Sequence, residues 1–186
     1  LLNGGDGKDV VSYQEAIASV TVNLKTGSAT NDSGNKDTLK NIENVIGSRF
    51  DDNIEGNPGK NQLIGGDGND TLTGNGGADI LQGGTGDDVY QLEIKNAKGT
   101  QIEDNGGTDT LELTGVTLTL NSLAKRKIGF QQNGTDLIID INRDGKATKS
   151  KDITIKDFAS KSGETAGEGF IEAIGNLSGD QILATI

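Results

Sequence analysis

The chain has 186 residues, of which 31% are hydrophobic, and its formal net charge at pH 7 is −11. Such an acidic chain should avoid nucleic acid and attract hard cations, which prefer carboxylate and carbonyl oxygen. The absence of Cys and His excludes disulfides, thiolate metal sites and Ser–His or Cys–His catalysis.

The length and the apolar content suit one domain or one elongated repeat unit with a cap. No stretch approaches 18 apolar residues, so we expect no membrane-spanning helix, and no N-terminal signal peptide is recognisable. The chain contains no Met and begins within a pattern at Leu1. We therefore expect it to be a piece of a longer protein.

Residues 1–46 are expected to form an N-terminal flank with one isolated repeat and an irregular β cap. The isolated repeat is Gly4–Ser12, in which Asp9 is a candidate metal ligand. Alternation of apolar and polar residues predicts a half-buried strand over Ala18–Leu24, followed by a polar loop over Lys25–Lys36. Short strands are expected at 37–39 and 44–46. Whether this flank joins the repeat structure stays open at this point.

Residues 47–91 contain five tandem units of nine residues, each opening on a glycine. The third unit, GGDGNDTLT, fits the pattern G-G-x-G-x-D-x-U-x, where U is a large apolar residue. Glycines allow left-handed backbone conformations, so the first six residues can form a tight turn and the last three a short strand. If two units close one coil, the apolar eighth positions form two inward rows. These rows are Ile54, Leu72 and Tyr90, and Leu63 and Leu81.

The sixth positions should also stack in alternate units, and they carry Asp52, Asn61, Asp70, Asp79 and Asp88. Rows of carboxylates a few ångströms apart repel one another, and a calcium ion between coils removes this repulsion. Aspartate also suits any glycine-rich turn, but that preference does not explain polar residues in strict register in five turns. Asn61, Pro58 and the Arg49–Phe50 pair depart from the pattern, which predicts weaker binding in the first two units.

Residues 92–186 are expected to form a β-rich C-terminal cap with a short helix. Gly106–Leu111 is a degenerate turn and strand that makes Asp109 a further candidate ligand. A hairpin is predicted from 136–141 and 152–158, a helical turn over 122–127, a short helix over 170–177 and a final strand over 181–186. Asp140 opens a sequence similar to an EF-hand loop, but Lys151 stands where an acidic residue is needed, so a hairpin loop is favoured.

The tandem units of Gly47–Gln91 resemble the RTX (repeats-in-toxin) family of secreted, calcium-binding β-roll proteins. The segments Gly134–Ile139 and Ile153–Phe158 are similar to the cap that often follows such repeats. The resemblance implies an all-β fold, a parallel β-roll (β-solenoid) with caps at both ends, that binds roughly three to five calcium ions. The candidate ligands are Asp9, Asp52, Asn61, Gly65, Gly66, Gly68, Asp70, Gly77, Asp79, Gly83, Gly84, Gly86, Asp88 and Asp109.

These expectations define a calcium-binding module of a larger secreted protein that folds cooperatively on binding calcium outside the cell. The family resemblance implies export of the unfolded chain through a type I secretion system. The module is expected to be monomeric and not an enzyme. Two alternatives stay open: a calcium-stabilised adhesion or ligand-binding module, and an accessory module of a secreted enzyme.

Overall fold

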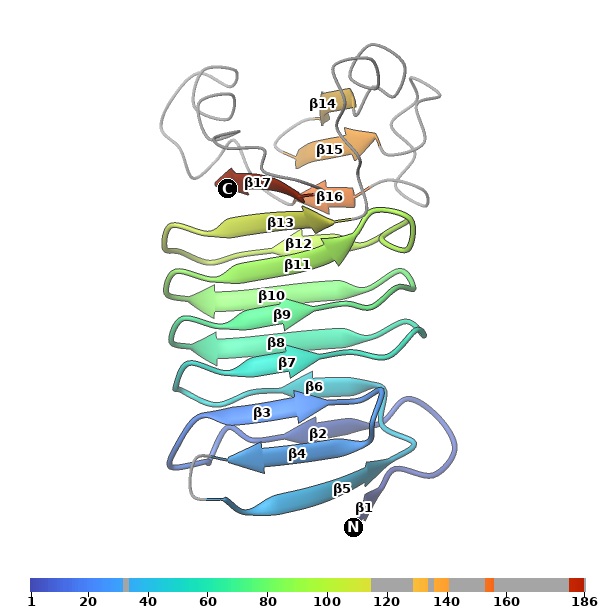
Figure 1. The fold of residues 1–186 in the computed structure, drawn as a ribbon, viewed down its shortest axis with the longest axis vertical. Coiled ribbons are helices and arrows are strands. Elements are labelled where there is room, and N and C mark those ends of the chain that lie inside the picture. Colours follow the sequence, from blue (N-terminus) through green and yellow to red (C-terminus); the bar gives the residue numbers. More distant parts are fainter. Residues whose placement is uncertain (32–33, 115–128, 134–135, 141–152, 156–180, 186) are drawn as a thin grey trace.

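The computed structural model describes residues 1–31, 34–114, 129–133, 136–140, 153–155 and 181–185. All regular elements within these residues are β-strands, and they form two sheets that face each other across a narrow core (Figure 1). One sheet has the order β1 (Leu2–Asn3), β5 (Lys36–Lys40), β4 (Ser28–Asn31), β3 (Val20–Asn23), β7 (Asn53–Glu55), β9 (Thr71–Thr73), β11 (Val89–Glu93), β13 (Thr110–Thr114), β17 (Gln181–Thr185). The other has the order β14 (Gly129–Asn133), β15 (Asp136–Asp140), β16 (Ile153–Ile155), β12 (Gln101–Glu103), β10 (Ile80–Thr85), β8 (Gln62–Asp67), β6 (Asn44–Ile46), β2 (Val10–Ser12).

Successive strands of the repeat region alternate between the two sheets, so two nine-residue units make one coil (Figure 1). The neighbouring strands of the repeat region are parallel within each sheet, with Asn53 beside Thr71 and Gln62 beside Ile80. The predicted parallel β-roll is therefore the fold of this region. Equivalent residues of adjacent coils lie 18 positions apart, which brings each turn over its chemical equivalent in the next coil.

The core consists of two inward rows of side chains, one from each sheet. Strand pairing aligns Ile54, Leu72 and Tyr90 in one row and Leu63 with Leu81 in the other, as the repeat predicted. All five side chains are fully buried. Since each short strand contributes one such side chain, neighbouring coils must complete one another's core.

The coil length changes after β11. Val89 pairs with Thr110 and Ile80 with Gln101, so equivalent residues are 21 positions apart instead of 18. The extra residues lie in the connection between β11 and β12, where Asn96 and Ala97 both donate main-chain hydrogen bonds to the Glu93 carbonyl. The residues that follow continue the stack, but the nine-residue count no longer locates them.

The N-terminal flank contributes strands to both sheets of the roll. Strand β2 lies parallel to β6, and β3 lies parallel to β7, with β4 and β5 added antiparallel beyond β3. The polar loop expected over Lys25–Lys36 is partly wrong, because Ser28–Asn31 forms β4. A tight turn with Gly27 at φ 68° reverses the chain after β3, and so lets the polar strand pair along the sheet edge.

The C-terminal strands confirm the predicted hairpin, since β15 and β16 pair antiparallel. Strand β16 extends one sheet beside β12, and β17 extends the other beside β13. The helical turn expected over 122–127, the short helix over 170–177 and the loop 141–152 lie outside the described residues.

Candidate metal centre

The turns between the sheets stack on two sides of the roll, and the two sides differ in charge. We call the side formed by turns 47–52, 65–70, 83–88 and 104–109 the acidic side, at the left in Figure 1. These turns carry Asp51, Asp52, Asp67, Asp70, Asp87, Asp88, Asp104 and Asp109 against a single cation, Arg49. The other side, formed by turns 56–61, 74–79 and 92–100, is called the mixed side. It carries Asp79 and Glu93 together with Lys60, Lys95 and Lys98.

On the acidic side the sixth-position residues form a continuous row of Asp52, Asp70, Asp88 and Asp109. The Oδ1 atom of each later residue accepts the main-chain N–H of the one before it, at 2.8 Å for Asp70, 2.7 Å for Asp88 and 3.0 Å for Asp109. Their side chains are almost completely buried, with at most 3% exposed. The structure thus brings these predicted ligands together.

Two carboxylates of this row, Asp70 and Asp88, and Asp79 on the mixed side each have one oxygen that the described protein leaves unsatisfied. Among the described residues, Oδ2 of Asp70, Asp79 and Asp88 is buried without a hydrogen-bond partner. An unpartnered buried carboxylate oxygen is costly, so such atoms require a bound cation or a proton. Burial and the neighbouring carboxylates Asp52 and Asp88 raise the pKa of Asp70 to about 8.

The other two carboxyls show the same effect. Burial, with the nearby Asp104 and Asp109 charges, raises the pKa of Asp88 to about 7. Burial also raises the pKa of Asp79 to about 7, against a smaller opposing effect of Lys60. The upward shift of the pKa in each case indicates that a negative charge at these positions lacks a compensating positive charge.

Glycines provide the space beside these carboxylates. A Cβ atom built at Gly65 would overlap with Oδ2 of Asp70, and one at Gly83 would overlap with Oδ2 of Asp88.

Glycines also let the turns stack closely. Gly66 and Gly84 have φ of 130° and 120°. They pack against main-chain carbonyl oxygens of the preceding coil, those of Ser48 and Gly66 respectively. Gly68 and Gly86 also have positive φ and lie against the turn of the preceding coil. Only glycine allows turns to stack this closely with carbonyl oxygens directed toward the next turn.

The acidic row ends differently at Asp52. Its Oδ2 accepts the Ser48 N–H at 2.5 Å, and its Oδ1 accepts the Ser48 hydroxyl and the Val20 N–H. Both oxygens therefore have protein partners, unlike those of Asp70 and Asp88. Ser48 stands where the full repeat has its second glycine, and sequence reasoning did not single it out.

The mixed side does not reproduce the row. Asn61 donates its side-chain amide to the Glu43 carbonyl at 2.7 Å and to Asn57 Oδ1 at 3.3 Å, while its own Oδ1 accepts the Asn57 N–H. The Asn61 amide thus stands at the position where the acidic row has a carboxylate. Asp79 Oδ1 accepts the Asn61 N–H, and Gly77 packs against the Gly59 carbonyl. Thr100, fully buried, follows Asp79 in the row, because β12 pairs with β10.

The isolated N-terminal repeat also lies on the mixed side, next to the segment before β6. The Asp9 N–H donates to Glu43 Oε2, and the Asp9 carbonyl accepts the N–H groups of Glu43 and Asn44. Oδ2 of Asp9 is buried without a partner in the part of the chain that the structure describes. Asp9 is thus in register with Asn61 and Asp79, apart from the acidic row.

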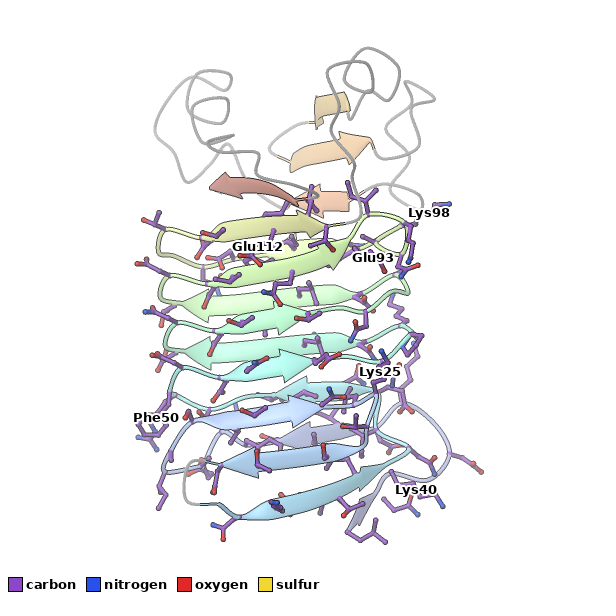
Figure 2. The ribbon with its side chains drawn as sticks, in the orientation of Figure 1. Lys25, Lys40, Phe50, Glu93, Lys98 and Glu112 are labelled. Atoms are coloured by element: carbon purple, nitrogen blue, oxygen red, sulfur yellow. The ribbon has the colours of Figure 1, made fainter. Side chains whose placement is uncertain are left out.

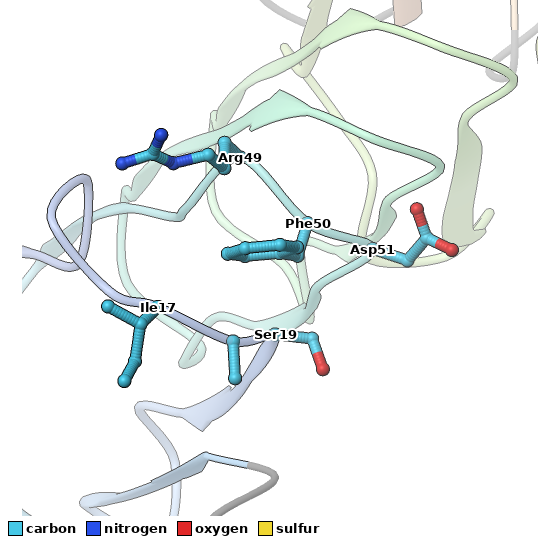
Figure 3. A pocket seen from close by; sticks show the side chains of 6 residues that line it. Ile17, Ser19, Arg49, Phe50 and Asp51 are labelled. Atoms are coloured by element: carbon cyan, nitrogen blue, oxygen red, sulfur yellow. The ribbon is translucent and has the colours of Figure 1, made fainter.

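Departures from the repeat also shape the surface near the N-terminal end. Ile17, Ala18, Ser19, Arg49, Phe50 and Asp51 line an open hollow of about 460 Å³ (Figure 3). Figure 3 shows Ile17 and the Phe50 ring directed to one side and Asp51 to the other. Phe50 projects from the acidic side, whereas Lys25 and Lys98 lie on the mixed side (Figure 2). The hollow contains no unsatisfied buried polar atom of the kind found in the acidic row.

Comparison with known families agrees with the geometry. The family model of the RTX calcium-binding nonapeptide repeat, with four copies, matches residues 41–72 and residues 55–90. A search of curated proteins finds no match. The described residues contain no helix long and apolar enough to cross a membrane. Residues 41–90 are therefore RTX calcium-binding nonapeptide repeats, which form a structural β-roll and not a catalytic fold, and whose proteins are generally secreted.

Proposed function

We propose that the chain is the calcium-dependent folding module of a larger secreted protein, with the acidic side as its principal calcium-binding surface. The observation that carries the proposal is the row of buried carboxylates in which Oδ2 of Asp70 and Asp88 has no partner among the described residues. Calcium takes six to eight oxygen ligands in adaptable geometry, so a carboxylate row beside carbonyl-rich turns suits it better than it suits magnesium.

The proposed ligands on the acidic side are the side chains of Asp70, Asp88 and Asp109, with Asp52 at the end of the row. Carbonyl oxygens of the glycine-rich turns complete the set, from turns 65–70 and 83–88 (Gly65, Gly66, Gly68, Gly83, Gly84, Gly86). On the mixed side Asp79 with Gly77 is a weaker candidate, and Asp9 is another. Asn61 contributes at most a neutral oxygen, since its amide donors are used within the protein.

Calcium binding is expected to supply much of the folding free energy. Without the ion, folding would bury several carboxylates and order a chain with 29 Gly residues, both of which are unfavourable. With the ion, the binding free energy adds to the stability of the folded state only, because the unfolded chain has no preformed site. Coils that share ions and core contacts should then fold together.

Such a switch fits a chain that leaves the cell unfolded and folds outside it. Extracellular calcium modules bind at roughly 10⁻⁴–10⁻³ M, far above the calcium concentration of a cytosol. Support comes from the RTX repeats, because proteins of that family are generally secreted. Export through a type I secretion apparatus, a longer parent polypeptide and a monomeric, non-enzymatic module are parts of this proposal.

The test is a calcium titration of the chelator-treated chain, followed by far-UV circular dichroism, with magnesium as the control ion. We expect a cooperative gain of β-structure with calcium alone. Asp70→Asn should weaken the transition, because it replaces a buried charged ligand by a neutral one. Asp67→Asn is the matched control, since it removes the same charge from the exposed part of the same turn. Equal transitions in the two variants, or a fully folded chain in chelator at pH 7.5 or above, would contradict the proposal.

A further inference from the structure

The turn 104–109 differs from the turns beneath it in one decisive position. It stacks on turn 83–88 through the 21-residue register, which places Asp104 over Gly83. The full repeat has glycine at this position, whereas this turn brings a third carboxylate to the acidic row. One carboxylate oxygen each from Asp88, Asp104 and Asp109 lies within 4.8 Å of the others. Turns 83–88 and 104–109 contain no Lys or Arg.

A second observation shows that this cluster needs a ligand. Asp88 is 1% exposed, its Oδ1 accepts the Asp70 N–H, and its Oδ2 is buried without a partner in the described structure. That Oδ2 atom is directed toward Asp104: a Cβ built at Gly83 would overlap with both Asp88 Oδ2 and the Tyr90 hydroxyl. The same hydroxyl donates to Asp104 Oδ2 at 2.5 Å.

Tyr90 explains how the third carboxylate is held in place. The eighth position carries Ile or Leu in the four preceding units, but the ring of Tyr90 fills the core position and its hydroxyl extends to the acidic side. There it accepts the Gly83 N–H at 2.8 Å and donates to Asp104. Asp104 Oδ1 accepts the Gly106 N–H at 2.7 Å. These bonds orient Asp104 but supply no positive charge.

We propose that Asp88, Asp104 and Asp109 bind one calcium ion that the roll binds more tightly than any other. The inference rests on the proposed function, since it takes the roll to bind calcium, and adds a ligand set with three carboxylates at the end of the row. Affinity in calcium sites rises with the number of charged ligands and with the rigidity of the site. The Tyr90 and Gly106 hydrogen bonds provide that rigidity.

The direct experiment is calorimetric calcium titration of the whole chain and of Asp104→Asn. This variant keeps the Oδ1 acceptor for Gly106, and it removes the charge and replaces Oδ2, the acceptor of the Tyr90 hydroxyl, by an NH2 group. We expect the tightest binding step to weaken about tenfold or more, with the weaker steps unchanged. Asp87→Asn is the matched control, because Asp87 is exposed in the turn beneath and uses its Oδ1 to accept the Thr108 N–H.

A spectroscopic experiment on folded protein covers the case in which Asp104→Asn does not fold. The chain has two Tyr and no Trp, so Tb³⁺ bound in this cluster would be excited through Tyr90. Tyr90→Phe should abolish the tyrosine-sensitised emission of the first Tb³⁺ equivalent. Tyr13→Phe should leave it, because Tyr13 lies in the N-terminal flank with its hydroxyl on Asp37.

The outcomes separate this inference from the proposed function. Asp104→Asn binding as tightly as Asp87→Asn, or emission that survives in Tyr90→Phe, overturns the three-carboxylate site. If Asp70→Asn still weakens binding in that case, the calcium-binding roll stands without it. If the unaltered chain takes up no calcium at all, the proposed function fails first.

Discussion

In the absence of calcium, protons should take the place of the ion in the acidic row. The pKa of Asp70 is raised to about 8 in the folded chain, chiefly by burial, against about 3.9 for an unperturbed Asp. The charged neighbours that act on it, Asp51, Asp52 and Asp88, are all acidic. Folding therefore requires this carboxyl to be protonated, and the cost of that protonation increases as the pH rises.

The sign and size follow from linkage. The folded state holds a proton on Asp70 that the unfolded state has lost, so the stability of the calcium-free fold is greatest below about pH 4 and is lost as the pH rises through about 8. The loss is about 1.4 kcal/mol per pH unit for this group, or about 3 kcal/mol between pH 5.5 and 7.5. Asp79 and Asp88 act in the same direction. The total is large against a typical stability of 5–15 kcal/mol.

Urea unfolding in chelator at pH 5.5 and 7.5, followed by circular dichroism, measures this effect. We expect β-structure to persist to higher urea at pH 5.5, and Asp70→Asn to reduce the difference between the two pH values. In saturating calcium the order should reverse or disappear, because calcium competes with the proton for the same oxygens. Equal or greater stability at pH 7.5 in chelator would refute the reasoning.

Three further predictions concern the core, the turns and the mixed side. Leu72→Ala should cost about 2–5 kcal/mol in calcium-saturated urea unfolding, because Leu72 is fully buried between its row neighbours. Gly84→Ala should destabilise by about 1–3 kcal/mol in the same assay, since its φ is 120° and a Cβ would overlap with a carbonyl, and Gly106→Ala should cost less, because its φ of 157° is also strained but its Cβ meets no atom within 4 Å. Asn61→Asp should lower stability in chelator by about 1–3 kcal/mol and add one calcium equivalent in calorimetry, since it exchanges amide donors for a carboxylate beside Asp79.

The nine-residue period was enough to predict the roll and its core. If two units form one coil, equivalent residues lie 18 positions apart. Counting in steps of 18 then gives the inward rows through Leu72 and Leu63 and aligns Asp70 with Asp88. The hairpin of β15 and β16 was also predictable, because alternation in a strand is a local signal. These features depend on residues close in sequence or on a strict repeat.

Features that depend on insertions were missed. The flank joins the roll with equivalent residues 32 and 34 positions apart, because β4 and β5 are inserted between them. No nine-residue count could place β3 beside β7. The longer connection after β11 likewise shifts the register to 21, so Asp104 was not recognised as the counterpart of Gly83. Counting back from the strand Thr110–Thr114, and not forward from the repeat, would have found it.

The sequence predicted a calcium ligand at each of the five sixth positions. The structure separates these positions, because the two sides of the roll compensate the carboxylate charge in different ways. On the mixed side the Asn61 amide supplies donors from within the chain, and Lys60 lies near enough to Asp79 to oppose the rise in its pKa. On the acidic side the row passes Asp70, Asp88 and Asp109 without a cationic side chain in their own turns. Under the proposed function, a calcium requirement on the acidic side is sufficient to control both sides, because each strand of the core connects a turn on the acidic side to a turn on the mixed side. On that proposal neither sheet forms while the acidic turns stay apart.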